Sequence, residues 1–426
     1  MVTARASYDP RIEPNSAPSE AGDRYTVISS DCHAGADLLA YRDYLPAALH
    51  DDFDTWAPTF VNPFGDLDGP DADQNWDSAR RLRELAAEGI VAEVVFPNTV
   101  PPFFPASAIT APPPDAADFT RRWAGLQAHN RWLADFCAEA PLQRAGVAQI
   151  LLNDVDAAVA EIHWAREHGL RGGILLPGVP PGSPVPPLYA PDYDPIWQAC
   201  AELEMPVNHH SGSAVPDPGM YAASGAMFIV EITWFSHRAL WHLMFGGVFE
   251  RFPDLKLVLT EQSAGWIPGT LDLLEFYLQR FRSTLATNEM VFAGAVADAL
   301  TRTPHEYWAA NGYVGASFQS AEETAMRHEI GVDKIMWGSD FPHTEGTQPY
   351  TLEALRLAFA GVEPGEVAAM LGGNAASLYG FDLDALAPLA AEVGPLRADV
   401  ARPLTEAERP TDAMSPVFQP SAVRPW

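Results

Sequence analysis

The feature that most limits how this chain can fold is an alternation of short apolar runs with longer helical patterns. Eight runs are predicted β-strands, and most are continuously apolar, as expected for parallel strands covered on both faces. These runs are residues 25–31, 91–98, 144–152, 171–177, 206–212, 255–262, 312–318 and 334–342. Helical periodicity lies between them, for example over 78–90, 154–170 and 195–205. Eight strand–helix units predict an α/β fold of the (β/α)8 TIM-barrel class. The alternative, a doubly wound sheet, is disfavoured because no glycine-rich phosphate loop follows any run.

Several segments interrupt this alternation of predicted strands and helices. The insertions are residues 51–77, 99–116, 213–250 and 284–310. In a barrel, such insertions lie in the loops at the C-terminal face, where they form lids or substrate walls, so we expect a distorted barrel. We predict three parts: a flexible N-terminal arm over 1–24, the barrel over 25–385, and a proline-rich C-terminal tail over 386–426. The tail is expected to wrap the surface or to be partly disordered.

The charge balance excludes some partners. The 426 residues include 26 Lys and Arg against 56 Asp and Glu, a formal net charge of −30. A nucleic-acid backbone or an anionic membrane surface is bound by clustered basic side chains, so neither partner is expected. No apolar run reaches the roughly 18 residues of a membrane span, and no signal peptide is evident. The three cysteines, Cys32, Cys137 and Cys200, are scattered, which favours a reducing, cytoplasmic location.

Ionisable side chains follow the apolar runs at corresponding places. Because the C-terminal ends of barrel strands form the active site, we expect these side chains to meet. Asp31 and His33 end the first run, and residues two apart on a strand project to the same side, so both can bind one ion. The candidates at the other strand ends are His210, Glu261, Asp340 and His343. Either His209 or His210 can be the fifth-strand ligand, because adjacent residues on a strand face opposite sides.

Five longer motifs give these residues a context. They are VISSDCHAG, MPVNHHSGS, LMFGGVFERFPDLKLVLTEQSAGWIP, DKIMWGSDFPH and LGGNAASLYGF. Over about residues 25–385 the chain resembles the amidohydrolase superfamily, in the branch around aminocarboxymuconate semialdehyde decarboxylase. The resemblance implies a distorted barrel with a divalent metal in its mouth. It also implies that the metal ligands are Asp31, His33, His210 and Asp340, and that the protein is a dimer.

Two residues depart from the pattern of the family that this chain resembles. Family decarboxylases usually have His or Glu where this chain has Asp31, and a catalytic His at the end of the sixth strand, where this chain has Glu261. A carboxylate at that position can bind a metal or act as a general base. With His343, the site then has three carboxylates and three imidazoles, which suffices for one or two ions of Fe, Mn or Zn.

We therefore expect a metal-dependent hydrolase that uses a metal-activated water on a C–N or C–O bond of a small organic substrate. Asp340 would accept the proton of the water, and Glu261 would bind metal or assist as a base. The alternative is an O2-activating dinuclear Fe or Mn monooxygenase on the same barrel. Non-oxidative decarboxylation and a non-catalytic paralogue subunit are less favoured. The expected partners are the small-molecule substrate and either a second copy of the chain or a paralogue.

Overall fold

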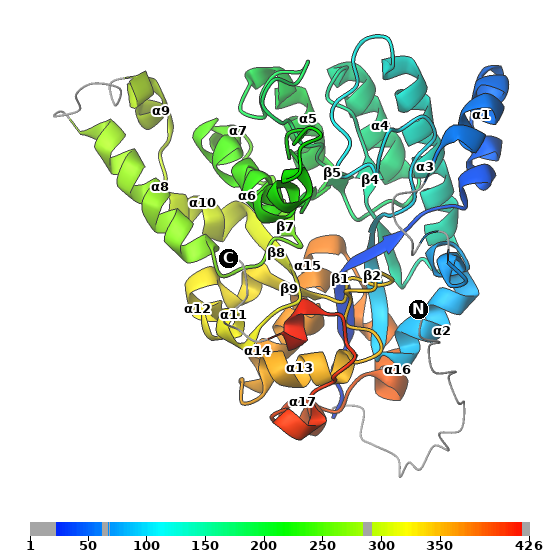
Figure 1. The fold of residues 1–426 in the computed structure, drawn as a ribbon. Coiled ribbons are helices and arrows are strands. Elements are labelled where there is room, and N and C mark those ends of the chain that lie inside the picture. Colours follow the sequence, from blue (N-terminus) through cyan, green and yellow to red (C-terminus); the bar gives the residue numbers. More distant parts are fainter. Residues whose placement is uncertain (1–22, 62–66, 68, 284–291, 420–426) are drawn as a thin grey trace.

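A computed structural model describes residues 23–61, 67, 69–283 and 292–419. Nearly all of the expected N-terminal arm lies outside these residues. Each of the eight apolar runs contains strand structure, and the third run forms two short strands in line (Figure 1). The strands are β1 (Val27–Ala34), β2 (Ile90–Pro97), β3 (Arg144–Gly146), β4 (Ala148–Gln149), β5 (Ile174–Leu175), β6 (Val207–His210), β7 (Leu257–Thr260), β8 (Gly312–Ser317) and β9 (Ile335–Gly338).

All strand pairs are parallel, and the strands follow one another in chain order. One sheet has the order β1-β2-β3 and the other has the order β4-β5-β6-β7-β8-β9. Only Val147 separates β3 from β4, and its N–H donates to the carbonyl of Val95 in β2 at 2.9 Å. At the other junction, the N–H of His33 in β1 donates to the carbonyl of Phe341 just beyond β9 at 2.7 Å. These links put the strands in the cyclic order of a (β/α)8 barrel, which confirms the predicted fold class.

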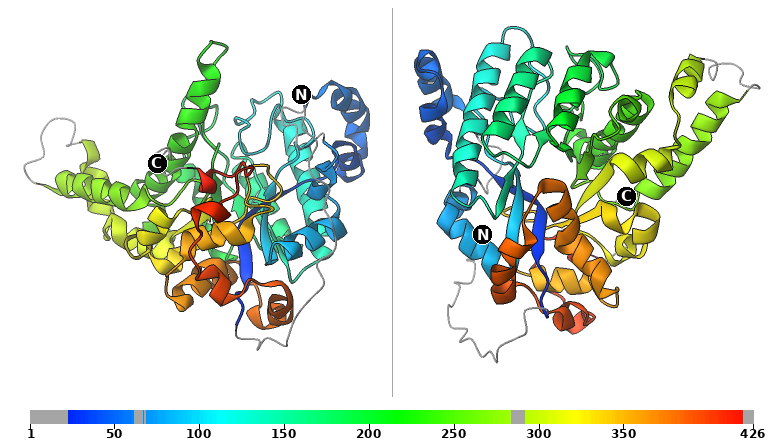
Figure 2. Two further views of the ribbon diagram at one scale, coloured as in Figure 1. Left: turned by 60° about the horizontal axis from the view of Figure 1, so that its bottom comes forward. Right: turned by 180° about the vertical axis from the view of Figure 1, so that it is seen from behind.

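Helices surround the strands and cover their outer faces (Figures 1 and 2). They are α1 (His50–Trp56), α2 (Ser78–Ala87), α3 (Phe119–Ala138), α4 (Val155–Glu167), α5 (Asp194–Glu202), α6 (Ser224–Phe245), α7 (Val248–Arg251), α8 (Ile267–Arg282), α9 (Gly294–Ala299), α10 (Pro304–Asn311), α11 (Ala321–Ala325), α12 (Arg327–Ile330), α13 (Thr351–Phe359), α14 (Pro364–Ala368), α15 (Asn374–Tyr379), α16 (Leu383–Val393) and α17 (Arg397–Val400). In all three views α8 and α9 project from the body as an arm. Among the described residues, no helix is both long enough and apolar enough to cross a bilayer.

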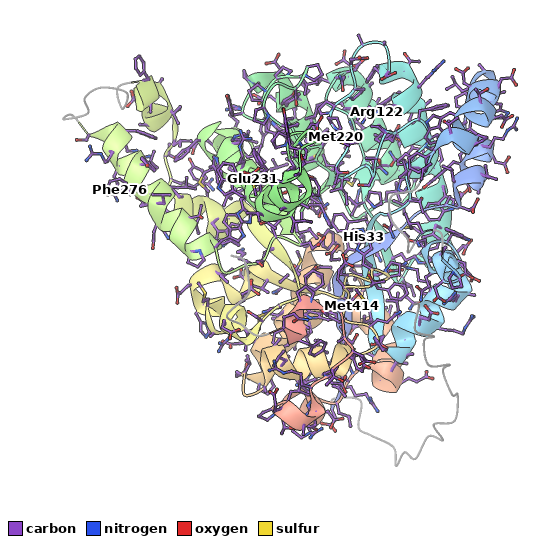
Figure 3. All side chains as sticks on the ribbon, in the orientation of Figure 1. His33, Arg122, Met220, Glu231, Phe276 and Met414 are labelled. Carbon is purple, nitrogen blue, oxygen red and sulfur yellow. The ribbon has the colours of Figure 1, made fainter. Side chains whose placement is uncertain are left out.

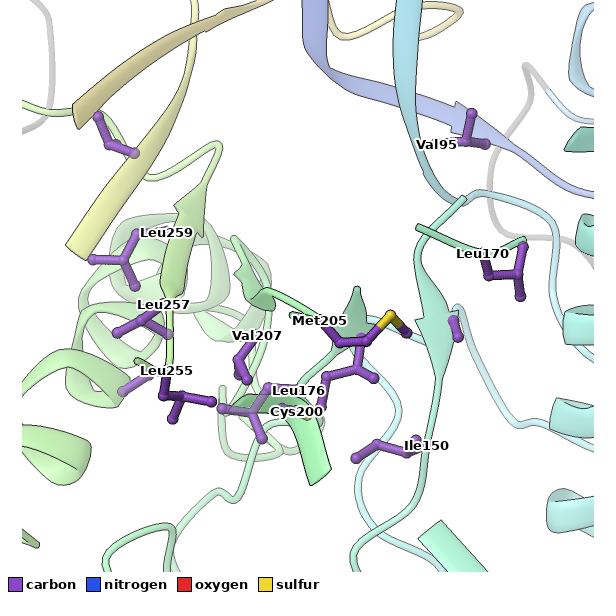
Figure 4. Packing of buried hydrophobic residues seen from close by; sticks show 14 of the residues in the cluster. Val95, Ile150, Leu170, Leu176, Cys200, Met205, Val207, Leu255, Leu257 and Leu259 are labelled. Atoms are coloured by element: carbon purple, nitrogen blue, oxygen red, sulfur yellow. The ribbon is translucent and has the colours of Figure 1, made fainter. Parts of the chain in front are cut away.

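The two faces of the strands pack into two different hydrophobic clusters. Leu257 and Leu259 of β7 belong to the larger cluster, between strands and helices (Figure 4). Val258 between them belongs to the second cluster, together with Val94 of β2 and Met336 of β9. Because side chains alternate along a strand, this division shows that the strands bury apolar residues on both faces. It explains why the sequence shows continuous apolar runs.

The C-terminal residues are packed against the barrel as far as they are described. The boundary predicted between barrel and tail, at residues 385 and 386, falls inside α16, which buries Leu386 and Ala390 in the second cluster. Further on, Val417 and Phe418 are buried against Ala354 of α13.

Candidate metal centre

The six candidate residues from the sequence lie at the ends of four strands, as expected for a barrel active site. Asp31 and His33 belong to β1 and His210 ends β6. Glu261 follows β7 directly, and Asp340 comes two residues after β9. Glu261 and Asp340 have left-handed backbones, with φ of 56° and 59°. Residues other than glycine seldom adopt this conformation, and it is concentrated at functional sites.

The glycine of the GSD sequence is the last residue of β9, and the close approach of Asp31 explains why it is a glycine. A Cβ on Gly338 would lie 2.7 Å from the Cβ of Asp31, so no larger residue fits without moving β1. The N–H of Asp340 donates to the carbonyl of Asp31 at 2.9 Å. The two carboxylate-bearing strand ends are therefore held side by side by backbone contacts.

The side chains of all six candidates converge. Nε2 of His33 lies 3.3 Å from Oδ1 of Asp31 and 3.3 Å from Oδ1 of Asp340. Nε2 of His210 lies 3.4 Å from Oδ1 of Asp31 and 3.4 Å from Oε2 of Glu261. Donor atoms of Asp31, His33, His210 and Glu261 all lie within 4.8 Å of one another, as do those of the set His33, Asp340 and His343. His33, labelled in Figure 3, is the residue that the two sets share.

The residues present fit a divalent cation. Nε2 of His33 and Oδ2 of Asp340 are buried and have no hydrogen-bond partner. We assign the ring protons of His33 and His210 to Nδ1, because these atoms face the carbonyls of Pro97 at 3.3 Å and Ser211 at 2.9 Å. Burial lowers the pKa of both rings, but Asp31 and the other carboxylates outweigh it and raise that pKa above its ordinary value. With a cation bound, Nε2 of each ring would carry the lone pair, which is the usual arrangement of a metal-binding histidine. Neutral imidazoles together with carboxylates suit Mn, Fe or Zn.

The electrostatics of the pocket also favour a positive ion. Burial raises the pKa of Asp31, but His210 and His33 outweigh it and hold that pKa below its ordinary value. The pKa of Glu261 is raised well above its ordinary value, first by burial and then by the charge of Asp340. Buried carboxylates are costly unless they are paired. A bound cation would stabilise the ionised form of both carboxylates.

His343 is held differently from the other histidines. Its Nδ1 lies 2.9 Å from Oδ1 of Asp340, and its Nε2 lies 3.1 Å from Oδ1 of Asn98. Both ring nitrogens therefore face oxygen acceptors. Burial lowers the pKa of His343, but the charge and hydrogen bond of Asp340 outweigh it and raise the pKa to about 10. The pair is an imidazolium–carboxylate in which Asp340 is buried and His343 is partly exposed. A metal-binding role for His343 stays a prediction.

The two adjacent histidines of β6 face opposite sides, as their spacing requires. His210 joins the cluster, whereas Nδ1 of His209 lies 3.3 Å from the carbonyl of Leu176. Burial lowers the pKa of His209 to about 4, so this ring is neutral. The structure thus brings His210, and not His209, to the other candidates.

Sequence reasoning missed one polar contact of the site. Ser317, the last residue of β8, donates a hydrogen bond from its hydroxyl to Oδ2 of Asp31. It is 3% exposed. Its place at the end of an apolar run, at the same depth as the other candidates, was the available signal. This bond leaves Oδ1 of Asp31 directed at the histidines.

Replacing Ser317 with alanine is expected to lower metal affinity by about tenfold to a hundredfold, because contacts that orient a ligand contribute that much. The matched control is Ser30→Ala, a buried serine of β1 that bonds only the carbonyl of Met336, at 2.9 Å. Competition with a chromophoric chelator measures both affinities. Equal affinities in the two variants would contradict the orienting role of Ser317.

The fold and the site define an enzyme built on a (β/α)8 barrel with a metal-binding cluster in its mouth. The chain belongs to the amidohydrolase family, whose model matches residues 31–381. This confirms the resemblance seen in the sequence motifs.

Curated relatives and solved structures agree with this assignment. The chain is 25% identical to gamma-resorcylate decarboxylase of Polaromonas sp. strain JS666, over 62% of this chain and 76% of that protein. It is also 25% identical to 2-amino-3-carboxymuconate-6-semialdehyde decarboxylase of Dictyostelium discoideum, over 72% of this chain and 77% of that protein. The crystal structure of 5-carboxyvanillate decarboxylase from Sphingomonas paucimobilis matches with a TM-score of 0.63 at 18% identity, covering 84% of this chain and all (100%) of that one.

A further solved structure contains a metal. The dihydroxybenzoic acid decarboxylase of Polaromonas sp. JS666, with bound manganese and the inhibitor 2-nitroresorcinol, matches with a TM-score of 0.58 at 18% identity, over 84% of this chain and 97% of that one. At this level of identity, the two structural matches support the fold alone.

Proposed function

We propose that this protein is a metal-dependent, non-oxidative decarboxylase of a small aromatic or similarly unsaturated carboxylic acid. The observation that carries the proposal is the pair of the buried Asp340 and the partly exposed His343 beside the metal-binding cluster. Decarboxylation without an oxidant exchanges a carboxylate for a proton at carbon, so it needs a proton store next to the bound substrate. The decarboxylase relatives, which carry this activity in their names, add weight to this proposal. Hydrolysis, which the sequence favoured, then becomes the second candidate.

The metal-binding residues and the Asp340–His343 pair have separate roles in this reaction. A divalent metal held by Asp31, His33, His210 and Glu261 would bind and polarise oxygen atoms of the acid. The Asp340–His343 pair holds the proton and delivers it from Asp340 to the carbon that carries the carboxylate. When the carbon–carboxylate bond breaks, its electron pair stays on that carbon and CO2 leaves. The deprotonated pair then takes up a proton from solvent, so the cycle balances with one proton consumed for each CO2.

We propose a single ion in the site. The set of four donors that includes Glu261 is complete without His343, whose two nitrogens already face Asp340 and Asn98. Manganese is the first ion to test, because a structural relative contains it and because carboxylate ligands favour a hard cation. Metal analysis of protein purified without added metal checks both the identity and the number of ions.

One observation favours hydrolysis as the second candidate. Oδ2 of Asp340 is buried and has no hydrogen-bond partner, so it can accept a proton from a metal-activated water. Glu261, which stands where the decarboxylases of the family usually have a histidine, offers a second carboxylate for this role.

Isotope labelling separates the two candidates. We expect the manganese-loaded protein in D2O to release CO2 from 2,6-dihydroxybenzoate or 5-carboxyvanillate, which are the acids named for its relatives. Deuterium is expected at the carbon that lost the carboxylate, and NMR detects it. Protein stripped with a chelator is the control.

Incorporation of 18O from labelled water into the product of an amide or lactone, with no CO2 from the acids, would favour hydrolysis. Oxygen uptake during turnover would instead favour the monooxygenase.

A further inference from the structure

A small cavity lies where the loop 104–113 and α3 meet the ends of β4 and β5, and none of the six candidate metal-site residues lines it. Residues of the loop 104–113, of α3, and of the segments 149–152 and 175–177 line it. The centre of a water molecule can occupy about 20 Å³ of this cavity. This is enough for one or a few small polar groups, but not for an aromatic ring. Most of its wall is apolar, and two polar side chains, Arg122 and Gln149, interrupt the wall.

Arg122 is a buried cation that no carboxylate of the described residues accompanies within 4.0 Å. Its side chain stacks over Phe104, with 4.4 Å from the guanidinium carbon to the ring centroid. Nη1 donates to the carbonyl of Pro112 at 2.8 Å, and Nε has no partner. Burial lowers the pKa of Arg122 to about 10, and only the charge of Asp118 opposes this. A buried guanidinium without a counter-ion is costly, which indicates that an anion completes the site.

The other buried arginines in the described part of the chain all have such a partner. Arg81 and Arg144 pair with Glu93 at 2.6 Å and 3.2 Å. Arg356 pairs with Glu408 at 2.8 Å. Arg122, at 5% exposure, is the exception. The lack of a carboxylate partner is therefore particular to Arg122 and is not shared by the other buried arginines of the described residues.

Gln149, on a different element, points to the same conclusion. It ends β4, is 2% exposed, and neither atom of its side-chain amide has a hydrogen-bond partner. Its backbone is fixed, because Asn130 of α3 accepts from its N–H and donates to its carbonyl, both at 2.9 Å. Leaving both atoms of a buried amide unpaired is costly. The cavity thus contains two kinds of hydrogen-bonding group that have no partner. They are N–H donors on both residues and one carbonyl acceptor on Gln149.

We propose that this cavity binds a small planar oxyanion that carries one O–H group, of which bicarbonate is the simplest. Its charged oxygens accept hydrogen bonds from Nε of Arg122 and from Nε2 of Gln149. Its hydroxyl donates to Oε1 of Gln149. Formate has the charge and the planarity but no hydroxyl, so it satisfies only part of the site. The inference is independent of which reaction the metal centre catalyses.

The position of the cavity links it to the catalytic face. The loop that lines it also contains Ile109 and Thr110, which lie against the turn after His210. A Cβ on Gly212 would lie 3.2 Å from Cγ2 of Thr110 and 3.3 Å from Cγ2 of Ile109. Figure 3 shows Arg122 among the helices beside the barrel, whereas His33 lies near the middle of the molecule. The bound anion would therefore sit behind the loop that borders the metal-binding cluster.

Titration calorimetry of the metal-loaded protein with sodium bicarbonate in CO2-free buffer tests the proposal. We expect Arg122→Met and Gln149→Leu each to bind one bicarbonate fewer per chain than the wild type, whatever binds at the metal. Arg121→Met is the matched control on the same helix, because Arg121 is 56% exposed and pairs with Asp52 at 2.9 Å. It is expected to retain the full stoichiometry. Unchanged binding by the Arg122 and Gln149 variants would overturn the proposal.

Two further measurements make the test independent of any one variant. Wild-type protein is expected to bind bicarbonate at this site roughly tenfold more tightly than formate, because only bicarbonate satisfies Oε1 of Gln149. Equal affinities would overturn the assignment of the hydroxyl. In crystals of the metal-loaded protein soaked with bicarbonate, density for a planar anion is expected between Arg122 and Gln149. Water alone at that place would also overturn the proposal.

Discussion

Replacing Asp340 with asparagine is expected to lower the kcat of CO2 release by about a thousandfold while leaving the metal in place. The size of the effect follows from the contribution of about 10²–10⁴ that a positioned acid or base makes to a rate. The asparagine side chain would keep the volume and the contact with His343, but it can neither hold nor accept the transferred proton. The measurements are kcat for CO2 release from 2,6-dihydroxybenzoate or 5-carboxyvanillate and metal content by mass spectrometry.

The contrast with Asp31 makes this prediction specific. Asp31 belongs to the set of four donors together with Glu261, whereas Asp340 belongs to the smaller set with His343. Asp31→Asn is therefore expected to lose both metal and activity, and Asp340→Asn to lose activity alone. If Asp340→Asn keeps more than a tenth of the wild-type kcat with full metal, the proton-transfer role of Asp340 is wrong. If it loses metal as readily as Asp31→Asn, Asp340 acts as a ligand.

The strands and the candidate site were predictable from the sequence because each depends on local pattern. Parallel strands that bury both faces must be continuously apolar, so the runs marked them, and the barrel rule then placed the strand ends together. The choice between His209 and His210 needed the structure, because alternation along a strand says that they differ in direction and not which one faces inward. The contact of Ser317 with Asp31 also needed the structure, because the place of Ser317 at a strand end indicates that it lies near the site but not which side chain it contacts.

The C-terminal region shows a different limit. Its prolines predicted a tail that wraps the surface or is partly disordered, without indicating a helix; α16 continues through Pro388 and buries Leu386 and Ala390 in the cluster that includes β2 residues. A proline inside a helix removes one hydrogen bond, which disfavours the helix locally. Burial of an apolar face against the barrel outweighs this loss, and the sequence of the tail alone contains no sign of the surface that it covers.

The largest effect on stability is expected at a buried charge cluster that also could not be predicted from local pattern. Glu93 is an isolated acid within the apolar run of β2, and it is fully buried with Arg81 of α2 and Arg144 of β3. Nη2 of Arg81 lies 2.6 Å from Oε2 of Glu93, and Nε of Arg144 lies 3.2 Å from Oε1. Nη1 of Arg81 also donates to the carbonyl of His33 at 2.7 Å. The cluster therefore joins a helix and two strands to the backbone of a candidate metal ligand.

Replacing Glu93 with glutamine is expected to lower the free energy of unfolding by about 3–5 kcal/mol, because it leaves two buried guanidinium groups without a counter-ion. The cost is that of uncompensated charge and not of lost volume, since glutamine has nearly the size of glutamate. Urea unfolding followed by circular dichroism measures it. The control is Asp54→Asn, which breaks an exposed pair with Arg42 at 2.7 Å and is expected to leave the midpoint nearly unchanged. A midpoint for Glu93→Gln equal to that of the control would mean that water or a rearrangement compensates the two arginines, and that the cluster does not anchor the end of β1.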